Sequence, residues 1–235
     1  MHKEILQEME RIFEGQAGVE VSKEKWMDAV DHFMPMLIEW TDSLAALAEK
    51  RFEKSVFRHS IKSPMFWQRP DATGLCSIDI SPVGRGRDLQ LSIGLYRSDQ
   101  WWPANVDMRV SFYGGNAIQG FKELYANYRR PVEVLLGQSA LKFETGGIYE
   151  SLDKYRGKQA AKKLDLFFSE EVDDNEGFAL AAEFYEEVQT EQVEQTFLVA
   201  AALYESCCGY ISRRNRVDEI FGYYLAMKKR RTNQR

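Results

Sequence analysis

The sequence predicts an α+β fold, in which an antiparallel sheet packs against helices, and three observations support this prediction. Three consecutive segments alternate between apolar and polar residues, which is typical of strands with one face on a core. Apolar residues recur at helical spacing before and after these segments. The chain of 235 residues is 44% hydrophobic, so it can bury a substantial core.

Two helices are expected near the N-terminus. The first covers residues 5–13, where apolar residues share one face, and a glycine-rich stretch ends it. The second begins near Ser22, which suits the N-cap position. Pro35 lies within the second helix, and we expect a kink or break there because proline removes a backbone donor.

A three-strand meander is the central prediction. Alternation covers residues 75–81, 88–96 and 106–113, and short connections join these segments. In the middle segment, for example, Leu91 faces one side and Ser92 the other. We therefore expect an antiparallel meander with one apolar and one polar face.

The rest of the chain is expected to add one helix, two strands and further helices. The helix starts near Asn116, is interrupted by Pro131 and leads to a C-terminal stop at Gly137. Two later strands are predicted at residues 140–144 and 163–168. Stripes at helical spacing predict helices containing Phe178, Ala181, Ala182 and Tyr185, then Val193, Phe197, Ala201 and Tyr204, and finally Val217, Ile220, Phe221, Tyr224 and Leu225.

The predicted organisation has three parts that pack as one compact unit. These parts are an N-terminal helical segment (1–60), an α+β sheet core (75–170) and a C-terminal helical segment (171–235). No apolar run is long enough to span a bilayer, and the three cysteines have no C-x-x-C spacing, so neither a disulfide framework nor a zinc site is expected. We expect a cytoplasmic protein without a membrane partner, a bound metal or a cofactor.

Charge is unevenly distributed along the chain. Residues 165–208 contain twelve acids and no base, whereas residues 209–235 contain eight bases and two acids. The acidic and basic segments could neutralise each other within the fold, or the basic segments could meet nucleic acid. The acidic block from Glu170 to Glu194 is either a solvated helix face or a docking surface for a basic partner, or a mimic of a nucleic-acid backbone.

The GRGR stretch at 84–87 joins two predicted strands. A phosphate loop would need a helix after its glycines, so we interpret GRGR as a hairpin turn with Arg85 and Arg87 projecting from it. Beside it, the polar sheet face offers Asp79, Asp107 and Arg109. A metal-dependent nuclease would use such carboxylates, but arginine stands where a lysine is expected.

Basic residues later in the chain suggest a second surface. Nucleic-acid contacts are predicted for Arg129, Arg130, Lys158, Lys162 and Lys163, together with Arg85 and Arg87. The aromatic residues Tyr155, Trp101 and Trp102 could stack on bases, although the two tryptophans could equally cap the end of a core.

Residues 105–200 resemble an uncharacterised bacterial domain associated with restriction-type nucleases and other defence genes. The similarity is carried by a helix, an E-x-x-L-G turn and a strand, at positions Phe121, Leu124, Glu133, Leu136, Gly137, Leu141, Phe143 and Glu144. It implies a prokaryotic or phage setting and transfers no catalytic residue.

These observations favour a non-catalytic binding or accessory protein of a defence or counter-defence system. It is expected to act through a protein partner, with nucleic acid as a further contact. A metal-dependent nuclease that uses carboxylates of the polar sheet face is the alternative.

Overall fold

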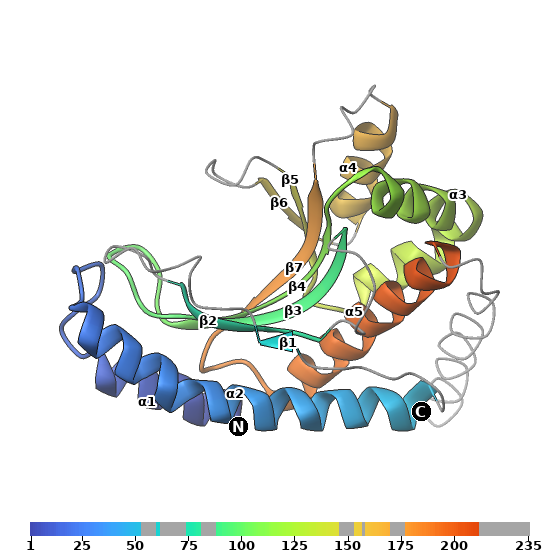
Figure 1. The fold of residues 1–235 in the computed structure, drawn as a ribbon. Coiled ribbons are helices and arrows are strands. Elements are labelled where there is room, and N and C mark those ends of the chain that lie inside the picture. Colours follow the sequence, from blue (N-terminus) through green and yellow to red (C-terminus); the bar gives the residue numbers. More distant parts are fainter. Residues whose placement is uncertain are drawn as a thin grey trace.

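The computed structural model describes residues 1–52, 60–61, 74–80, 88–145, 153–156, 158–169 and 177–211. It confirms the α+β fold (Figure 1). The elements in chain order are α1 (His2–Ile12), α2 (Lys23–Phe52), β1 (Ser60–Ile61), β2 (Gly74–Asp79), β3 (Leu89–Tyr96), β4 (Asn105–Phe112), α3 (Gly115–Gly137), β5 (Lys142–Thr145), β6 (Asp153–Arg156), α4 (Lys158–Ser169), β7 (Phe178–Phe184) and α5 (Thr190–Ile211).

The strands form one sheet in the order β1-β2-β3-β4-β7-β5-β6, and every neighbouring pair is antiparallel. The predicted meander is confirmed as β2, β3 and β4. In its register Ser92 of β3 lies opposite Arg109 of β4 and Asp79 of β2. The polar residues of all three strands therefore share one face, as the alternation predicts.

The prediction of a helix at Phe178–Tyr185 is wrong, because this segment contains β7. The strand lies between β4 and β5 and is hydrogen-bonded to both. Alanine favours helices, but Phe178, Leu180 and Phe184 alternate, and the sheet buries that apolar face. Pairing on both sides outweighs the local helix preference.

The predicted strand at residues 163–168 is also wrong, because these residues lie in α4. Ala160, Ala161 and Leu164 are buried at helical spacing, and Phe167 packs against Phe143 of β5. The strand-like alternation of Leu164 and Leu166 is misleading, since Leu166 is half exposed. Of the two later strands predicted, the one at 140–144 corresponds to β5.

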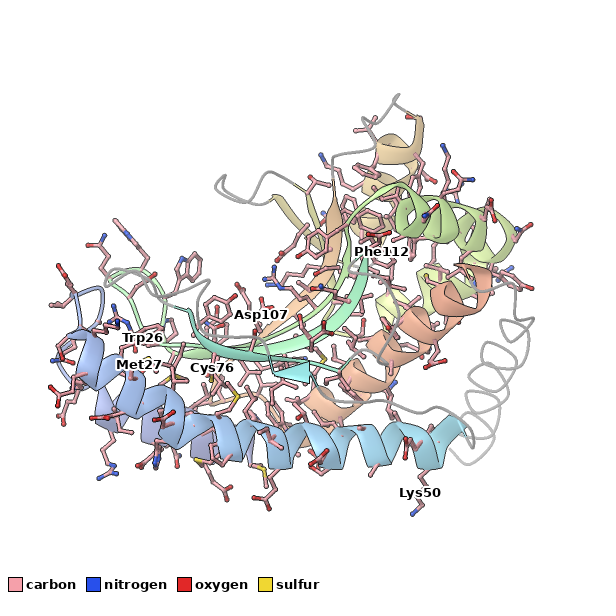
Figure 2. The ribbon with its side chains drawn as sticks, in the orientation of Figure 1. Trp26, Met27, Lys50, Cys76, Asp107 and Phe112 are labelled. Carbon is pink, nitrogen blue, oxygen red and sulfur yellow. The ribbon has the colours of Figure 1, made fainter. Side chains whose placement is uncertain are left out.

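All five helices of the described residues pack on the apolar side of the sheet. Helix α2 contacts β2, and α5 contacts β3, β4 and β7, so Cys76 is buried between the sheet and α2 (Figures 1 and 2). At the other end, Phe121 of α3 packs on Phe112 and Phe178. The sheet is strongly curved, and its other face, which carries Asp107, has no described helix on it.

The two prolines within helices behave differently. Helix α2 runs through Pro35 without a break, and its predicted N-cap is confirmed because Ser22 Oγ accepts from Lys25 N at 3.2 Å. Helix α3 has non-helical angles at Tyr128 (φ −128°, ψ 32°), three residues before Pro131. The interruption predicted for α3 is therefore confirmed.

Some predictions concern segments outside the described residues. The GRGR turn at 84–87 and the helix predicted around 217–225 are among them. Within the described segments no helix is long and apolar enough to cross a bilayer, and Cys76 and Cys207 are buried free thiols. The division into three parts stays a prediction.

Candidate functional site: the polar sheet face

The polar sheet face is the side of the sheet that faces away from the helices. Its residues are paired across the strands by the antiparallel register, which brings charged groups from distant parts of the chain together. We define it by Ser77, Asp79, Gln90, Ser92, Gly94, Tyr96, Asn105, Asp107, Arg109, Ser111, Lys142, Glu144, Ala179, Ala181 and Glu183. The predicted residues Asp79, Asp107 and Arg109 all lie on it.

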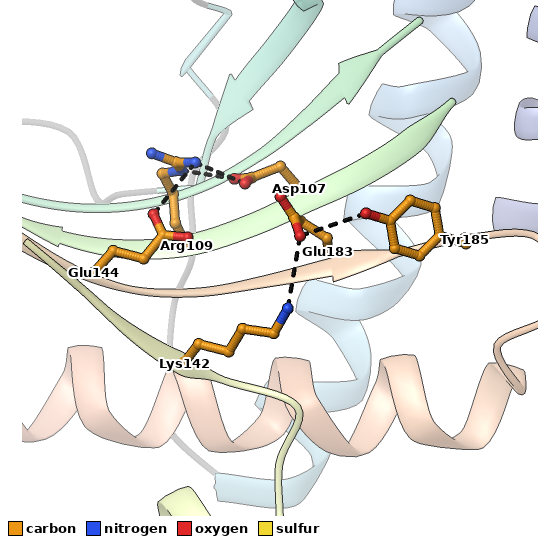
Figure 3. Close-up of polar contacts among 6 residues, drawn as sticks. All are labelled: Asp107, Arg109, Lys142, Glu144, Glu183 and Tyr185. Atoms are coloured by element: carbon orange, nitrogen blue, oxygen red, sulfur yellow. Dashed lines mark hydrogen bonds and ion pairs between the residues drawn. The ribbon is translucent and has the colours of Figure 1, made fainter. Parts of the chain in front are cut away.

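The strongest contact on this face joins Asp107 and Arg109. They are two residues apart on β4, so both side chains point to the same side. Arg109 Nε donates to Oδ1 of Asp107, and Nη2 donates to Oδ2, both at 2.6 Å (Figure 3). The Asp107 side chain is only 7% exposed, so this two-point ion pair is largely removed from water.

Glu144 of β5 approaches the same guanidinium. Its Oε2 lies 3.9 Å from Nη2 of Arg109, and its side chain is 2% exposed. One arginine thus faces two buried carboxylates. The negative charge of Asp107 is the main reason why the pKa of Arg109 is raised above its ordinary value, against the opposing effect of burial.

A second ion pair lies beside the first. Lys142 Nζ of β5 is 3.6 Å from Oε2 of Glu183 on β7, and the Tyr185 hydroxyl donates to the same oxygen at 3.5 Å (Figure 3). Both charged side chains are partly exposed, at 17% and 23%. These two groups are therefore more accessible to a ligand than Asp107 and Glu144.

The Asp107–Arg109 pair and Tyr96 are poorly suited to proton transfer. Arginine does not give up its proton near neutral pH, and both oxygens of Asp107 already accept from it. Burial raises the pKa of the Tyr96 hydroxyl above its ordinary value, so this group stays neutral. In the described parts of the chain no three His, Cys, Asp or Glu side chains could hold a metal ion together.

The fold brings only some of the residues predicted to contact nucleic acid close together. Arg129 of α3 forms ion pairs with Glu133 and with Asp165 of α4, and Arg130 and Lys162 are exposed on the same two helices. Two carboxylates therefore neutralise Arg129. Lys163 is half-buried. Arg85, Arg87 and the side chain of Lys158 lie outside the described residues.

The two exposed tryptophans are far from these basic residues. Trp101 and Trp102 lie in the turn between β3 and β4, which contacts α1 and the α1–α2 connection. Figure 1 shows that end of the sheet opposite α3 and α4. The tryptophans are exposed, so they do not cap a core, and a single surface combining them with Arg130 and Lys162 is not formed.

Three charged residues of the polar sheet face were not anticipated, namely Lys142, Glu144 and Glu183. Lys142 and Glu144 alternate with apolar neighbours in β5. The strand has only four residues, which is too short an alternation to predict which side chains face the core. Glu183 falls within the helix predicted at Phe178–Tyr185, and that prediction does not place its carboxylate on the sheet. Recognising the alternation of Phe178, Leu180 and Phe184 would have put Glu183 on this face.

No family model matches this chain, and no curated protein matches it. The resemblance of residues 105–200 to a bacterial defence-associated domain therefore stays an expectation.

Proposed function

We propose that this protein is a non-catalytic binding protein that acts through protein–protein contacts, with the polar sheet face as a recognition surface. The observation that carries the proposal is the set of charged side chains from β4, β5 and β7 that this face brings into contact (Figure 3). Burying charges is costly, so a group of paired charges on a face without a described helix favours a binding role over a purely structural one.

Glu183 favours a cationic partner group on this face. By register the face carries four carboxylates, those of Asp79, Asp107, Glu144 and Glu183, and four cations, those of Arg109, Lys142, Lys154 and Arg156, so its formal charges balance and the access of each group decides what it can bind. Glu183 is the carboxylate with the clearest access, since Asp107 and Glu144 are almost fully buried. A lysine or arginine of a partner could compete with Lys142 for it.

The setting in a prokaryotic or phage defence or counter-defence system is part of the same proposal. It is supported by the sequence resemblance over residues 105–200. The exposed Arg130 and Lys162 support a weaker, secondary contact with nucleic acid, because only two described side chains of the predicted set are both exposed and outside an ion pair.

The binding role can be tested by co-expressing the protein with the products of neighbouring genes and measuring complexes by size-exclusion chromatography with light scattering. We expect a stoichiometric complex that Glu183→Gln weakens about tenfold, or about 1.4 kcal/mol. Glu8→Gln is the matched control, because Glu8 is a similarly exposed carboxylate (26%) paired with Arg11 on α1. A complex that both variants form equally well would remove the polar sheet face from the proposal.

The non-catalytic part needs a separate assay. Labelled DNA and RNA are incubated with the protein and magnesium or manganese, and we expect no cleavage. Metal-dependent cleavage that Asp79→Ala or Asp107→Ala abolishes would instead establish the nuclease alternative.

A further inference from the structure

The turn between β3 and β4 displays two adjacent tryptophans to solvent. Trp101 is 76% exposed and Trp102 is 62% exposed, and Pro103 beside them is exposed as well. Large aromatic side chains gain much free energy on burial, and they are enriched where proteins bind one another. We call residues 98–103 the tryptophan turn.

The tryptophan turn is held in one shape by hydrogen bonds. Oδ1 of Asp99 accepts from the backbone N–H of Trp101 and of Trp102, both at 2.7 Å, and Asp99 N donates to Trp102 O at 2.8 Å. Glu10 of α1 fixes both ends, since its Oε1 accepts from Ser98 Oγ at 2.5 Å and from Ala104 N at 3.1 Å. A partner would therefore lose little free energy in ordering this turn.

The α1–α2 connection supports the turn from the side. Arg97 is buried at the end of β3 and donates to the carbonyl oxygens of Gln16 and Val19, at 2.7 and 2.8 Å. Gly18 has φ +66°, and a Cβ there would lie 3.1 Å from the backbone N of Gln100, so the two segments are in close contact. The half-exposed Val19 thus extends the apolar surface next to the turn.

The charge around this apolar surface is negative. Residues 13–22 and 98–104 contain Glu14, Glu20 and Asp99 but no lysine or arginine, and the carboxylate of Glu10 lies directly beneath the turn. Arg97 lies at the start of the turn, but its guanidinium is buried against backbone carbonyls. Phosphate groups of a nucleic acid would be repelled here, whereas cationic groups would be attracted.

Among the described residues next to these two segments, Lys23 is an exposed cation, but Glu14, Glu20 and Asp99 outnumber it, and two other cations at this end are engaged. Arg11 pairs with Glu8, and Nζ of Lys25 lies 5.6 Å above the ring of Phe13. The faces of two exposed indoles attract lysine and arginine side chains, and the surrounding carboxylates add to that attraction.

We propose that the tryptophan turn, Val19 and the carboxylates around them form a docking surface for a basic protein segment that places arginine side chains on the indole rings. This inference deepens the proposed function, because it rests on action through protein contacts, but it uses a different surface from the polar sheet face. It also assigns a use to two tryptophans that neither the sheet nor the core requires.

The test measures binding of a fluorescein-labelled peptide of alternating arginine and glycine by fluorescence anisotropy. We expect the wild-type protein to bind it, high salt to weaken binding, and the double variant Trp101→Ala, Trp102→Ala to weaken it about tenfold. Leu166→Ala is the matched control, since it removes a comparably exposed apolar side chain from α4. Both variants change exposed residues, so their thermal unfolding is expected to match the wild type.

A control peptide and a carboxylate variant test the role of charge in this binding. The same peptide with glutamate in place of arginine is expected not to bind, and Glu14→Gln with Glu20→Gln is expected to weaken binding of the arginine peptide severalfold. No binding by the wild type, equal binding by the tryptophan variant, or tighter binding of a labelled single-stranded DNA would overturn the inference. Loss of peptide binding in Glu183→Gln alone would refute it while supporting the polar sheet face.

Discussion

Removing Arg109 should destabilise the fold more than removing Asp107, because the arginine neutralises two buried carboxylates. For charge centres roughly 4 Å apart and an effective dielectric constant of about 20, the attraction between Asp107 and Arg109 is about 4 kcal/mol. Glu144 Oε2 lies 3.9 Å from Nη2 of Arg109. With its charge centre roughly 5.5 Å from that of the guanidinium, its attraction adds about 3 kcal/mol at the same dielectric constant. Asp107→Asn loses the first contribution only, whereas Arg109→Gln loses both.

The measured losses in the free energy of unfolding will be smaller than these Coulomb energies. The Arg109 side chain is 26% exposed, so water screens its charge. We expect the free energy of unfolding to fall by about 3–5 kcal/mol in Arg109→Gln and by about 2 kcal/mol in Asp107→Asn. In Asp107→Asn, the arginine keeps Glu144 as a counterion and the amide oxygen as a hydrogen-bond acceptor. In Arg109→Gln, two carboxylates are left facing each other.

Urea unfolding followed by tryptophan fluorescence measures these values, since Trp26 and Trp40 are buried and report on the core. Equal losses for both variants, or a larger loss in Asp107→Asn, would refute the reasoning.

Three further predictions concern backbone packing and buried titratable groups. Gly177→Ala should lower the free energy of unfolding by about 1–3 kcal/mol in urea denaturation, because a Cβ would lie 2.8 Å from the carbonyl oxygen of Phe112. Burial raises the pKa of the Cys76 thiol to about 12, so mass spectrometry should find it unmodified by iodoacetamide at pH 8 until urea unfolds the protein. His2 is buried against the carbonyl oxygen of Val188, and burial lowers its pKa from the ordinary 6.5. Thermal stability should therefore fall as the pH drops below about 6.5, and His2→Gln should reduce that slope; an unchanged slope would contradict this assignment.

The meander could be predicted because its strands alternate and their neighbours in the chain are also their neighbours in the sheet. Ser92 and Arg109 are opposite each other for the same reason that Leu91 and Val110 are, so the polar sheet face follows from the pattern of three strands. The predicted residues Asp79, Asp107 and Arg109 come from this local information.

The rest of the candidate site could not be predicted because it depends on non-local pairing. Glu144 lies near Arg109 because β7 pairs with both β4 and β5 and so brings β5 close to β4 in the sheet. No local sequence pattern encodes that strand order. Alanine-rich β7 has helix preference, and α4 contains an alternating pair, so both were assigned the wrong structure. The exposure of Trp101 depended on tertiary contacts of its turn, which the sequence pattern does not reveal.

The late position of β7 in the chain has a consequence for how the protein folds during synthesis. The meander β2–β4 is complete by residue 112, but β4 gains its second partner only when residues 178–184 have been made. Until then the β4 edge has unpaired backbone groups beside an apolar face, and the β5–β6 hairpin has no strand to join. Nascent chains that stall before residue 178 should therefore aggregate readily, and release of the full chain should be followed by slow completion of the sheet.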